Sequence, residues 1–120
     1  MIEYVSLREL KINEFDQIWC VTRSKKSVVR NSIRVECLAP SIELFNDSQT
    51  AKKEDRFNEF FEQEYVSRYL DQIRNNHEAM TMLQYLKHSS DSGQRCAIVC
   101  FCKDEKFCHR SLIKRLFESL

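Results

Sequence analysis

An apolar run near the C-terminus, from Cys96 to Cys102, is compatible with only a few classes of fold. Every residue of this Cys-Ala-Ile-Val-Cys-Phe-Cys segment is apolar, so a strand formed here would bury both of its faces. Strands of that kind occur in the middle of parallel sheets whose two faces are covered by helices. The run therefore predicts an α/β fold.

The order of the other predicted elements agrees with this fold. A short apolar run over 18–21 suits a second buried strand, and Ser41 is placed to cap a short helix. Apolar residues at helical spacing predict helices over about 54–74 and 77–87, and a last helix from about Cys108. We therefore expect an α/β fold with a small, mostly parallel sheet flanked by helices, in one compact domain over residues 1–120.

Glycine and proline are scarce, with one of each in 120 residues. A Gly-rich phosphate loop needs several glycines close together, and an all-β fold needs many tight turns, so the sequence argues against both. No apolar run approaches the length of about 20 residues that a bilayer span requires. The N-terminus also lacks the basic start and apolar stretch of a secretory signal, so we expect a cytoplasmic protein without a membrane partner.

The chain contains six cysteines, and four of them lie between residues 96 and 108. Such uneven spacing, in a chain long enough to bury a core, argues against a disulfide framework. In a reducing compartment the cluster is better explained by buried structural thiols, by a reactive thiol or by metal ligands. For Cys20, Cys37 and Cys96 we expect the structural role.

The triplet Cys108-His109-Arg110 is the strongest candidate for a functional site. It opens a helix that otherwise faces the core, where a polar triplet has little packing purpose. A helix N-terminus favours a thiolate and binds anions, because its backbone N–H groups are free and it carries partial positive charge. We therefore predict Cys108 as a nucleophile, His109 as its general acid and base, and Arg110 as a holder of an anionic substrate. Cys100 would lie nearby at the end of its strand.

Arg23 and Ser24 follow the other predicted strand, within a stretch over 17–35 that has five basic residues and no acidic one. Ligands of open parallel sheets bind beyond the carboxyl ends of the strands. We therefore expect Arg23 and Ser24 to share one cleft with Cys108-His109-Arg110.

A second interpretation of the same segment is a zinc site formed by Cys100, Cys102, Cys108 and His109. Their spacing differs from the usual pair of Cys-x-x-Cys knuckles, and His109 directly follows the last cysteine, so one ion would need unusual geometry. We therefore predict no cofactor and keep zinc as the alternative.

Several elements together resemble the domain of unknown function 488 family. They are Leu38-Ala39-Pro40-Ser41 followed by Leu44-Phe45, then Phe60 with Tyr65, and Cys100-Phe-Cys-Lys-Asp with Cys108-His109-Arg110. The resemblance covers the chain from about Trp19 onward and implies a compact α/β domain of bacteria, archaea and their phages. It also implies site positions, and these are Arg23, Ser24, Pro40, Ser41, Tyr65, Cys100, Cys108, His109 and Arg110.

The residues and the resemblance lead to two hypotheses of function. The first is a cytoplasmic domain that binds a phosphorylated or otherwise anionic ligand, a nucleotide or nucleic acid, with thiol-dependent catalysis at Cys108 as a possible extension. The second is a non-enzymatic interaction protein, which a phage could encode, in which the cysteine cluster is structural or binds metal. The sequence leaves both open, and it gives no oligomeric state.

Overall fold

The computed structural model describes residues 2–6, 9–22, 32–100 and 108–120 of the chain. Its centre is a sheet of four parallel strands. The strands are β1 (Ile2–Ser6), β2 (Gln17–Cys20), β3 (Ser32–Arg34) and β4 (Cys96–Cys100). The helices are α1 (Ile42–Lys53), α2 (Phe57–Phe60), α3 (Val66–Arg74), α4 (His77–Asp91) and α5 (His109–Glu118).

The strand order β1-β4-β2-β3 places β4 and β2 in the middle of the sheet. The pairing aligns Cys20 with Val99, and the Val21 N–H continues the ladder by donating to the Val99 carbonyl at 3.1 Å. Every residue of β4 is buried, as its unbroken apolar sequence requires. The carboxyl ends of β4 and β2 therefore lie side by side.

The two faces of the sheet are covered differently. One face, with Trp19, Cys96 and Ile98, belongs to the main core and packs against the α-helices. The opposite face is covered in the described residues by the segment around Leu10 and Phe15, which includes the short 3-10 helix η2 (Ile12–Glu14). The predicted α/β class and parallel sheet are thus confirmed, but the second face of β4 carries no α-helix within the described part of the chain.

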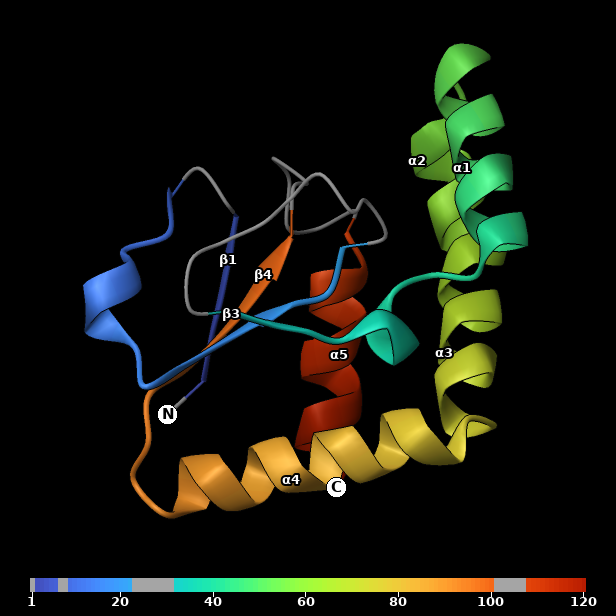
Figure 1. Cartoon of the computed structure of the whole chain (residues 1–120). Coiled ribbons are helices and arrows are strands. Elements are labelled where there is room, and N and C mark those ends of the chain that lie inside the picture. Colours follow the sequence, from blue (N-terminus) through green and yellow to red (C-terminus); the bar gives the residue numbers. More distant parts are fainter. Residues whose placement is uncertain (1, 7–8, 23–31, 101–107) are drawn as a thin grey trace.

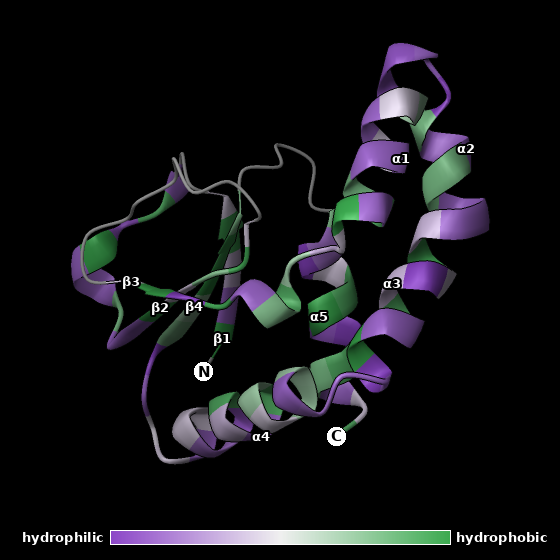
Figure 2. Ribbon diagram, turned by 45° about the vertical axis from the view of Figure 1, so that its right-hand side comes forward, coloured by the Kyte–Doolittle hydropathy of each residue, from purple (hydrophilic) through white to green (hydrophobic). Residues whose placement is uncertain are grey.

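Three consecutive elements form a helical arm that extends away from the sheet, with α1 and α2 side by side (Figure 1). The arm consists of α1, α2 and the π-helix η4 (Phe61–Tyr65), and it continues into α3. Asp55 makes the turn between α1 and α2 with a φ of 57°. Figure 2 shows mostly hydrophilic residues along the outer part of this arm and hydrophobic residues along the strands.

The last two helices both contribute to the main core. α4 crosses below the sheet, and α5 runs between the sheet and the helical arm (Figure 1). α5 buries Leu112, Ile113 and Leu116 against β1, β4 and α3. Gly93, with a φ of 93°, makes the turn that joins α4 to β4.

The structure extends the predictions made from the sequence. The strand predicted at 18–21, the helices after Ser41 and from His77, and the last helix are all present. β1 and β3 were not predicted, and the expected helix over 54–74 is divided by the π-helical turn η4. No helix in the described part of the chain is long and apolar enough to cross a membrane.

Candidate functional site

Two cysteines that were predicted to belong to the site, Cys100 and Cys108, lie together at the carboxyl end of the central strands. Cys100 is the last residue of β4, and Cys108 immediately precedes α5 as its N-cap residue. Their Sγ atoms are 2.8 Å apart, and both cysteines are about 1% exposed. The sheet and the helix therefore hold the two thiols in direct contact inside the protein.

His109 joins this pair to the neighbouring strand. Its Nε2 lies 2.7 Å from the carbonyl oxygen of Val21, the residue that follows β2, and its Nδ1 lies 3.7 Å from Cys108 Sγ. A carbonyl oxygen only accepts hydrogen bonds, so Nε2 must be the nitrogen that carries the proton in the neutral ring. The lone pair of Nδ1 is then directed toward the Cys108 thiol and can receive its proton.

The amino end of α5 supplies a favourable electrostatic environment for negative charge at Cys108. The Cys108 side chain makes no capping hydrogen bond to the first turn, and the Ser111 hydroxyl instead donates to the Cys108 carbonyl at 2.8 Å. The partial positive charge of the helix terminus is thus not offset by an acidic or hydroxyl cap from this residue. This charge favours a thiolate at Cys108, whereas the burial of the thiol opposes one.

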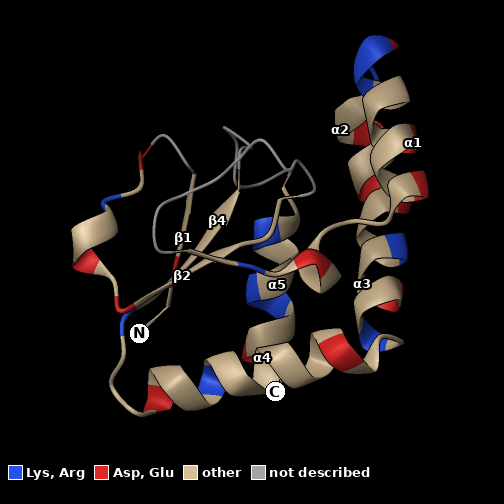
Figure 3. Ribbon diagram, viewed as in Figure 1, with Lys and Arg blue, Asp and Glu red and all other residues tan. Residues whose placement is uncertain are grey.

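Arg110 lies in the first turn of the same helix and is only 2% exposed. A buried guanidinium needs acceptors or negative groups close to it, because its desolvation is costly. Its position two residues after Cys108 adds a fixed positive charge to this buried end of the sheet. Figure 3 shows that most other charged residues of the described chain lie on helices and connecting segments.

Two stacked tyrosines connect the helical arm to His109. The Tyr69 ring lies 5.7 Å from the His109 ring, and Tyr65 stacks on Tyr69 at 6.0 Å. The predicted residue Tyr65 thus approaches the site through Tyr69. Tyr69 was not among the predicted site residues, although its spacing of four residues from Tyr65 places both rings on one helix face.

Tyr69 also ties the site to the Leu-Ala-Pro-Ser element. Its hydroxyl donates to the Leu38 carbonyl at 2.6 Å. Burial, followed by the nearby ionisable groups of Tyr65 and Cys108, raises the pKa of the Tyr69 phenol well above its ordinary value. The phenol is therefore a neutral hydrogen-bond donor at physiological pH.

Ser41 has a clear structural role at the start of α1. Its Oγ accepts from the Leu44 N–H at 3.1 Å, as predicted for a cap. Gln72 holds the same element from α3, because its side chain accepts from the Ser41 N–H and donates to the Ala39 carbonyl, both at 2.9 Å. The contacts of Ser41 in the structure are thus those of a helix cap, and its implied part in ligand binding stays a prediction.

Three predicted residues lie outside the described part of the chain: Arg23, Ser24 and Cys102. The cleft that Arg23 and Ser24 would share with Cys108 therefore stays a prediction. Val21, two residues before Arg23, does contact the site through the hydrogen bond to His109.

Three of the four residues predicted as zinc ligands lie together in the structure. Within the described residues, one group of three potential metal ligands occurs, formed by Cys100, Cys108 and His109, and their ligand atoms all lie within 4.8 Å of one another. The Nδ1 atom of His109 would be the nitrogen ligand, because Nε2 is hydrogen-bonded to the carbonyl oxygen of Val21. Cys102, the fourth predicted ligand, is among the residues not described.

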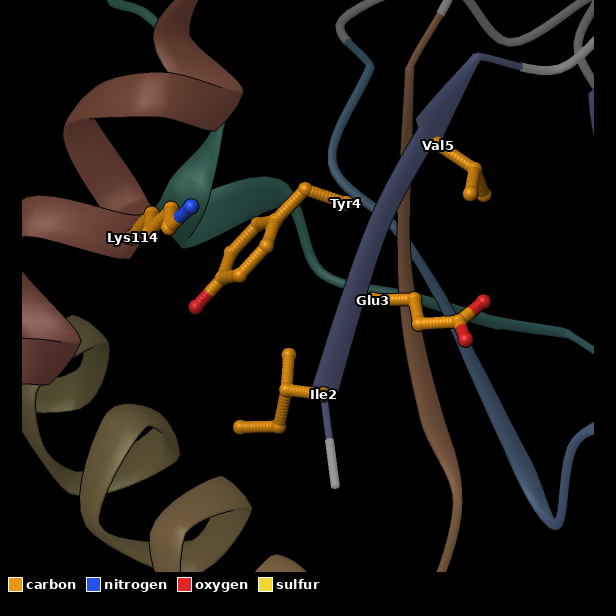
Figure 4. A pocket seen from close by; sticks show the side chains of 5 residues that line it. All are labelled: Ile2, Glu3, Tyr4, Val5 and Lys114. Carbon is orange, nitrogen blue, oxygen red and sulfur yellow. The ribbon is translucent and has the colours of Figure 1, made fainter.

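Two pockets in the described residues lie away from this cluster. The first, about 370 Å³, is lined by residues of β1 and by Lys114 of α5. Figure 4 shows Tyr4 and Lys114 on one side of β1, and Glu3 and Val5 on the other. The second, about 580 Å³, is lined by Arg34, Val35, Glu36, Cys37, Asn76, Glu78 and Met82.

Comparison with known proteins agrees with the resemblance found in the sequence. No curated protein and no solved structure matches the chain. A family model described as DUF488-N3a, the active DUF488-N3 subclade, matches residues 2–120. Because the match covers nearly the whole chain, the protein belongs to the DUF488 family.

Proposed function

We propose that this domain binds a phosphorylated or otherwise anionic ligand, a nucleotide or nucleic acid, at the amino end of α5. In this proposal Cys108 is a thiolate nucleophile and His109 is its general base and acid. The word "active" in the description of the matching subclade agrees with a catalytic site, although it names no reaction.

The observation that carries the proposal is the orientation of the His109 ring. The contact of 2.7 Å with the Val21 carbonyl fixes the protonated nitrogen, and the contact of 3.7 Å directs the other nitrogen toward Cys108. A nucleophile, a base and a group that orients the base form the usual arrangement of covalent catalysis. A cysteine that served only in packing would not require this orientation of its neighbour.

Two sources of positive charge support an anionic ligand. The N-terminus of α5 attracts anions through its dipole and its backbone N–H groups. The buried Arg110 adds a full positive charge in the first turn, and a guanidinium matches the geometry of phosphate and carboxylate. Arg23 and Ser24 would extend this site if they lie where the sequence predicts.

The test is the binding of adenosine triphosphate, inorganic phosphate and a single-stranded oligonucleotide by calorimetry. We compare Arg110→Lys with Arg115→Lys, an exposed arginine of the same helix. Lysine retains the charge but loses the forked geometry, so Arg110→Lys should weaken binding about tenfold or more, and Arg115→Lys should have no effect. A salt dependence that steepens with oligonucleotide length would identify nucleic acid as the ligand. Equal binding by the two variants, or no binding of any probe, would refute the anion site.

A second candidate function is favoured by the grouping of Cys100, Cys108 and His109 within 4.8 Å. Two thiolates and one imidazole nitrogen form a ligand set that suits zinc, with a fourth position for another ligand. The protein would then be an interaction domain whose metal site holds α5 against the sheet. Elemental analysis of the purified protein decides between the two functions, because stoichiometric zinc that is lost in His109→Gln would favour the metal site over a free nucleophile.

A further inference from the structure

We propose that Cys100 and Cys108 form a reversible disulfide, in which Cys108 reacts first with hydrogen peroxide and Cys100 is the resolving thiol. The proposal rests on the function proposed above, because it requires a reactive thiolate at Cys108. It adds a modification site and a means of regulation, since the disulfide removes the nucleophile.

The distance between the two sulfur atoms is the first support. Cys100 Sγ and Cys108 Sγ are 2.8 Å apart, and a disulfide bond is about 2.05 Å long. The sulfurs therefore need to approach by less than about 1 Å. Cys20 and Cys96 are also buried, but within the described residues the sulfur–sulfur contact is that of Cys100 with Cys108.

The surroundings of the two thiols assign different roles to them. Cys108 lies at the helix N-terminus with the Nδ1 atom of His109 at 3.7 Å, and both features favour its thiolate. Cys100 ends β4 and is held by pairing with Ser6 of β1. Cys108 is therefore the thiol that attacks the oxidant, and Cys100 is the thiol that then attacks the oxidised Cys108.

The reaction proceeds in two balanced steps. The Cys108 thiolate attacks one oxygen of hydrogen peroxide, the O–O bond breaks, and the released hydroxide takes the proton from His109 to form water. The product is the sulfenic acid of Cys108. The Cys100 sulfur then attacks the Cys108 sulfur, the S–O bond breaks, and the released hydroxide takes the Cys100 proton to form a second water. Two thiols lose two electrons in all, and one peroxide gains them.

The position of lysines and arginines makes the product easy to detect. Cleavage by trypsin after Arg95, Lys103, Lys106 and Arg110 separates peptide 96–103 from peptide 107–110. A disulfide of Cys108 with Cys100 joins these two peptides, and dithiothreitol separates them again. Because peptide 96–103 contains three cysteines, single serine variants at Cys96, Cys100 and Cys102 identify the partner.

The experiment exposes the reduced full-length protein to hydrogen peroxide and maps the peptides by mass spectrometry, with dimedone present in a parallel sample. We expect the two peptides to be linked in the wild type, in Cys96→Ser and in Cys102→Ser. In Cys100→Ser we expect no link and a dimedone adduct on Cys108, because the sulfenic acid is no longer resolved.

Two results would overturn the inference, and they are distinguishable from a failure of the proposed function. A link that survives Cys100→Ser, or a wild type that gives only the dimedone adduct on Cys108, refutes Cys100 as the resolving thiol but leaves Cys108 reactive. A Cys108 that forms neither a link nor an adduct refutes the proposed nucleophile as well.

Discussion

Cys37 and Cys108 differ both in their exposure to solvent and in the groups that surround them. Their comparison shows which of these two differences bears on the ionisation of a thiol. Cys37 lies in the 3-10 helix η3 (Glu36–Leu38), is partly exposed, and lines a pocket with Glu36 and Glu78. Cys108 is about 1% exposed and lies beside an imidazole at a helix N-terminus. The more accessible thiol thus has acidic neighbours, and the buried thiol has a base and a helix dipole.

Burial and a nearby negative charge both oppose the ionisation of Cys37. Burial, followed by the negative charge of Glu78, raises the pKa of the Cys37 thiol above its ordinary value. Burial likewise raises the pKa of the Cys96 thiol. Cys37 and Cys108 therefore differ in the groups beside them, and we predict from this difference that Cys108 is the more reactive thiol.

The largest expected effect tests this contrast directly. Methyl methanethiosulfonate is small and uncharged, so it can enter a buried site with little selection by charge. At pH 7 we expect Cys108 to be modified about tenfold faster than Cys37, because more of it is thiolate. Cys108→Ser should abolish the fast reaction, whereas Cys37→Ser should leave it unchanged, as followed by peptide mass spectrometry. Equal rates at the two cysteines would contradict the contrast.

The second effect isolates the contribution of the imidazole. His109→Gln keeps a side chain that can donate to the Val21 carbonyl but has no group that accepts a proton from Cys108. We expect the rate of modification of Cys108 at pH 7 to fall about tenfold, and the rate of Cys37 to stay the same. His88→Gln, on α4, is the matched control. A Cys108 rate that does not change in His109→Gln would show that the helix terminus alone activates the thiol.

The parts of the fold that sequence predicts are those whose signal lies in consecutive residues. β4 was found because its apolar residues are continuous. β1 was missed because it is an edge strand with Glu3 between apolar residues, and β3 because it has only three residues, two of them exposed. The π-helical turn over Phe61–Tyr65 was missed because an apolar stripe does not reveal one additional residue in a turn.

The same limit applies to the candidate site. Cys108 and His109 are neighbours in sequence, so their pairing could be predicted. The contact of His109 with the Val21 carbonyl could not, because it joins residues 88 positions apart and any residue supplies a backbone carbonyl. That Cys100 lies near Cys108 could be predicted, but the direct contact of their two sulfur atoms depends on how β4 and α5 pack in three dimensions.

Tyr69 connects the surroundings of Cys37 with those of Cys108. Its hydroxyl bonds to the carbonyl of Leu38, next to Cys37, and its ring contacts His109. Tyr69→Phe leaves that buried carbonyl without the hydroxyl, so we expect a loss of about 1–3 kcal/mol in the free energy of unfolding. Chemical denaturation measures this loss.

The matched control for Tyr69→Phe is Tyr85→Phe, whose residue is 53% exposed and should change stability by less than about 0.5 kcal/mol. The phenylalanine ring at position 69 still packs on His109, so the reactivity of Cys108 should be retained. A large loss of Cys108 reactivity without loss of stability would mean that the hydroxyl itself acts on the site.

The smallest effect is expected at Cys37. Because the charge of Glu78 contributes to the raised pKa of this thiol, Glu78→Gln should lower that pKa and increase the thiolate fraction. Burial is the larger cause and is unchanged, so the modification rate at pH 8 should rise only about two- to threefold. Glu43→Gln is the control, because Glu43 is an exposed residue of α1. In wild type the rate at Cys37 should continue to increase with pH above the ordinary range of a thiol, and Glu78→Gln should move this increase to lower pH. If Glu78→Gln instead made Cys37 as reactive as Cys108, removal of one acidic neighbour would be enough to activate a thiol. The imidazole and the helix terminus beside Cys108 would then not be needed to explain why the two cysteines are modified at different rates.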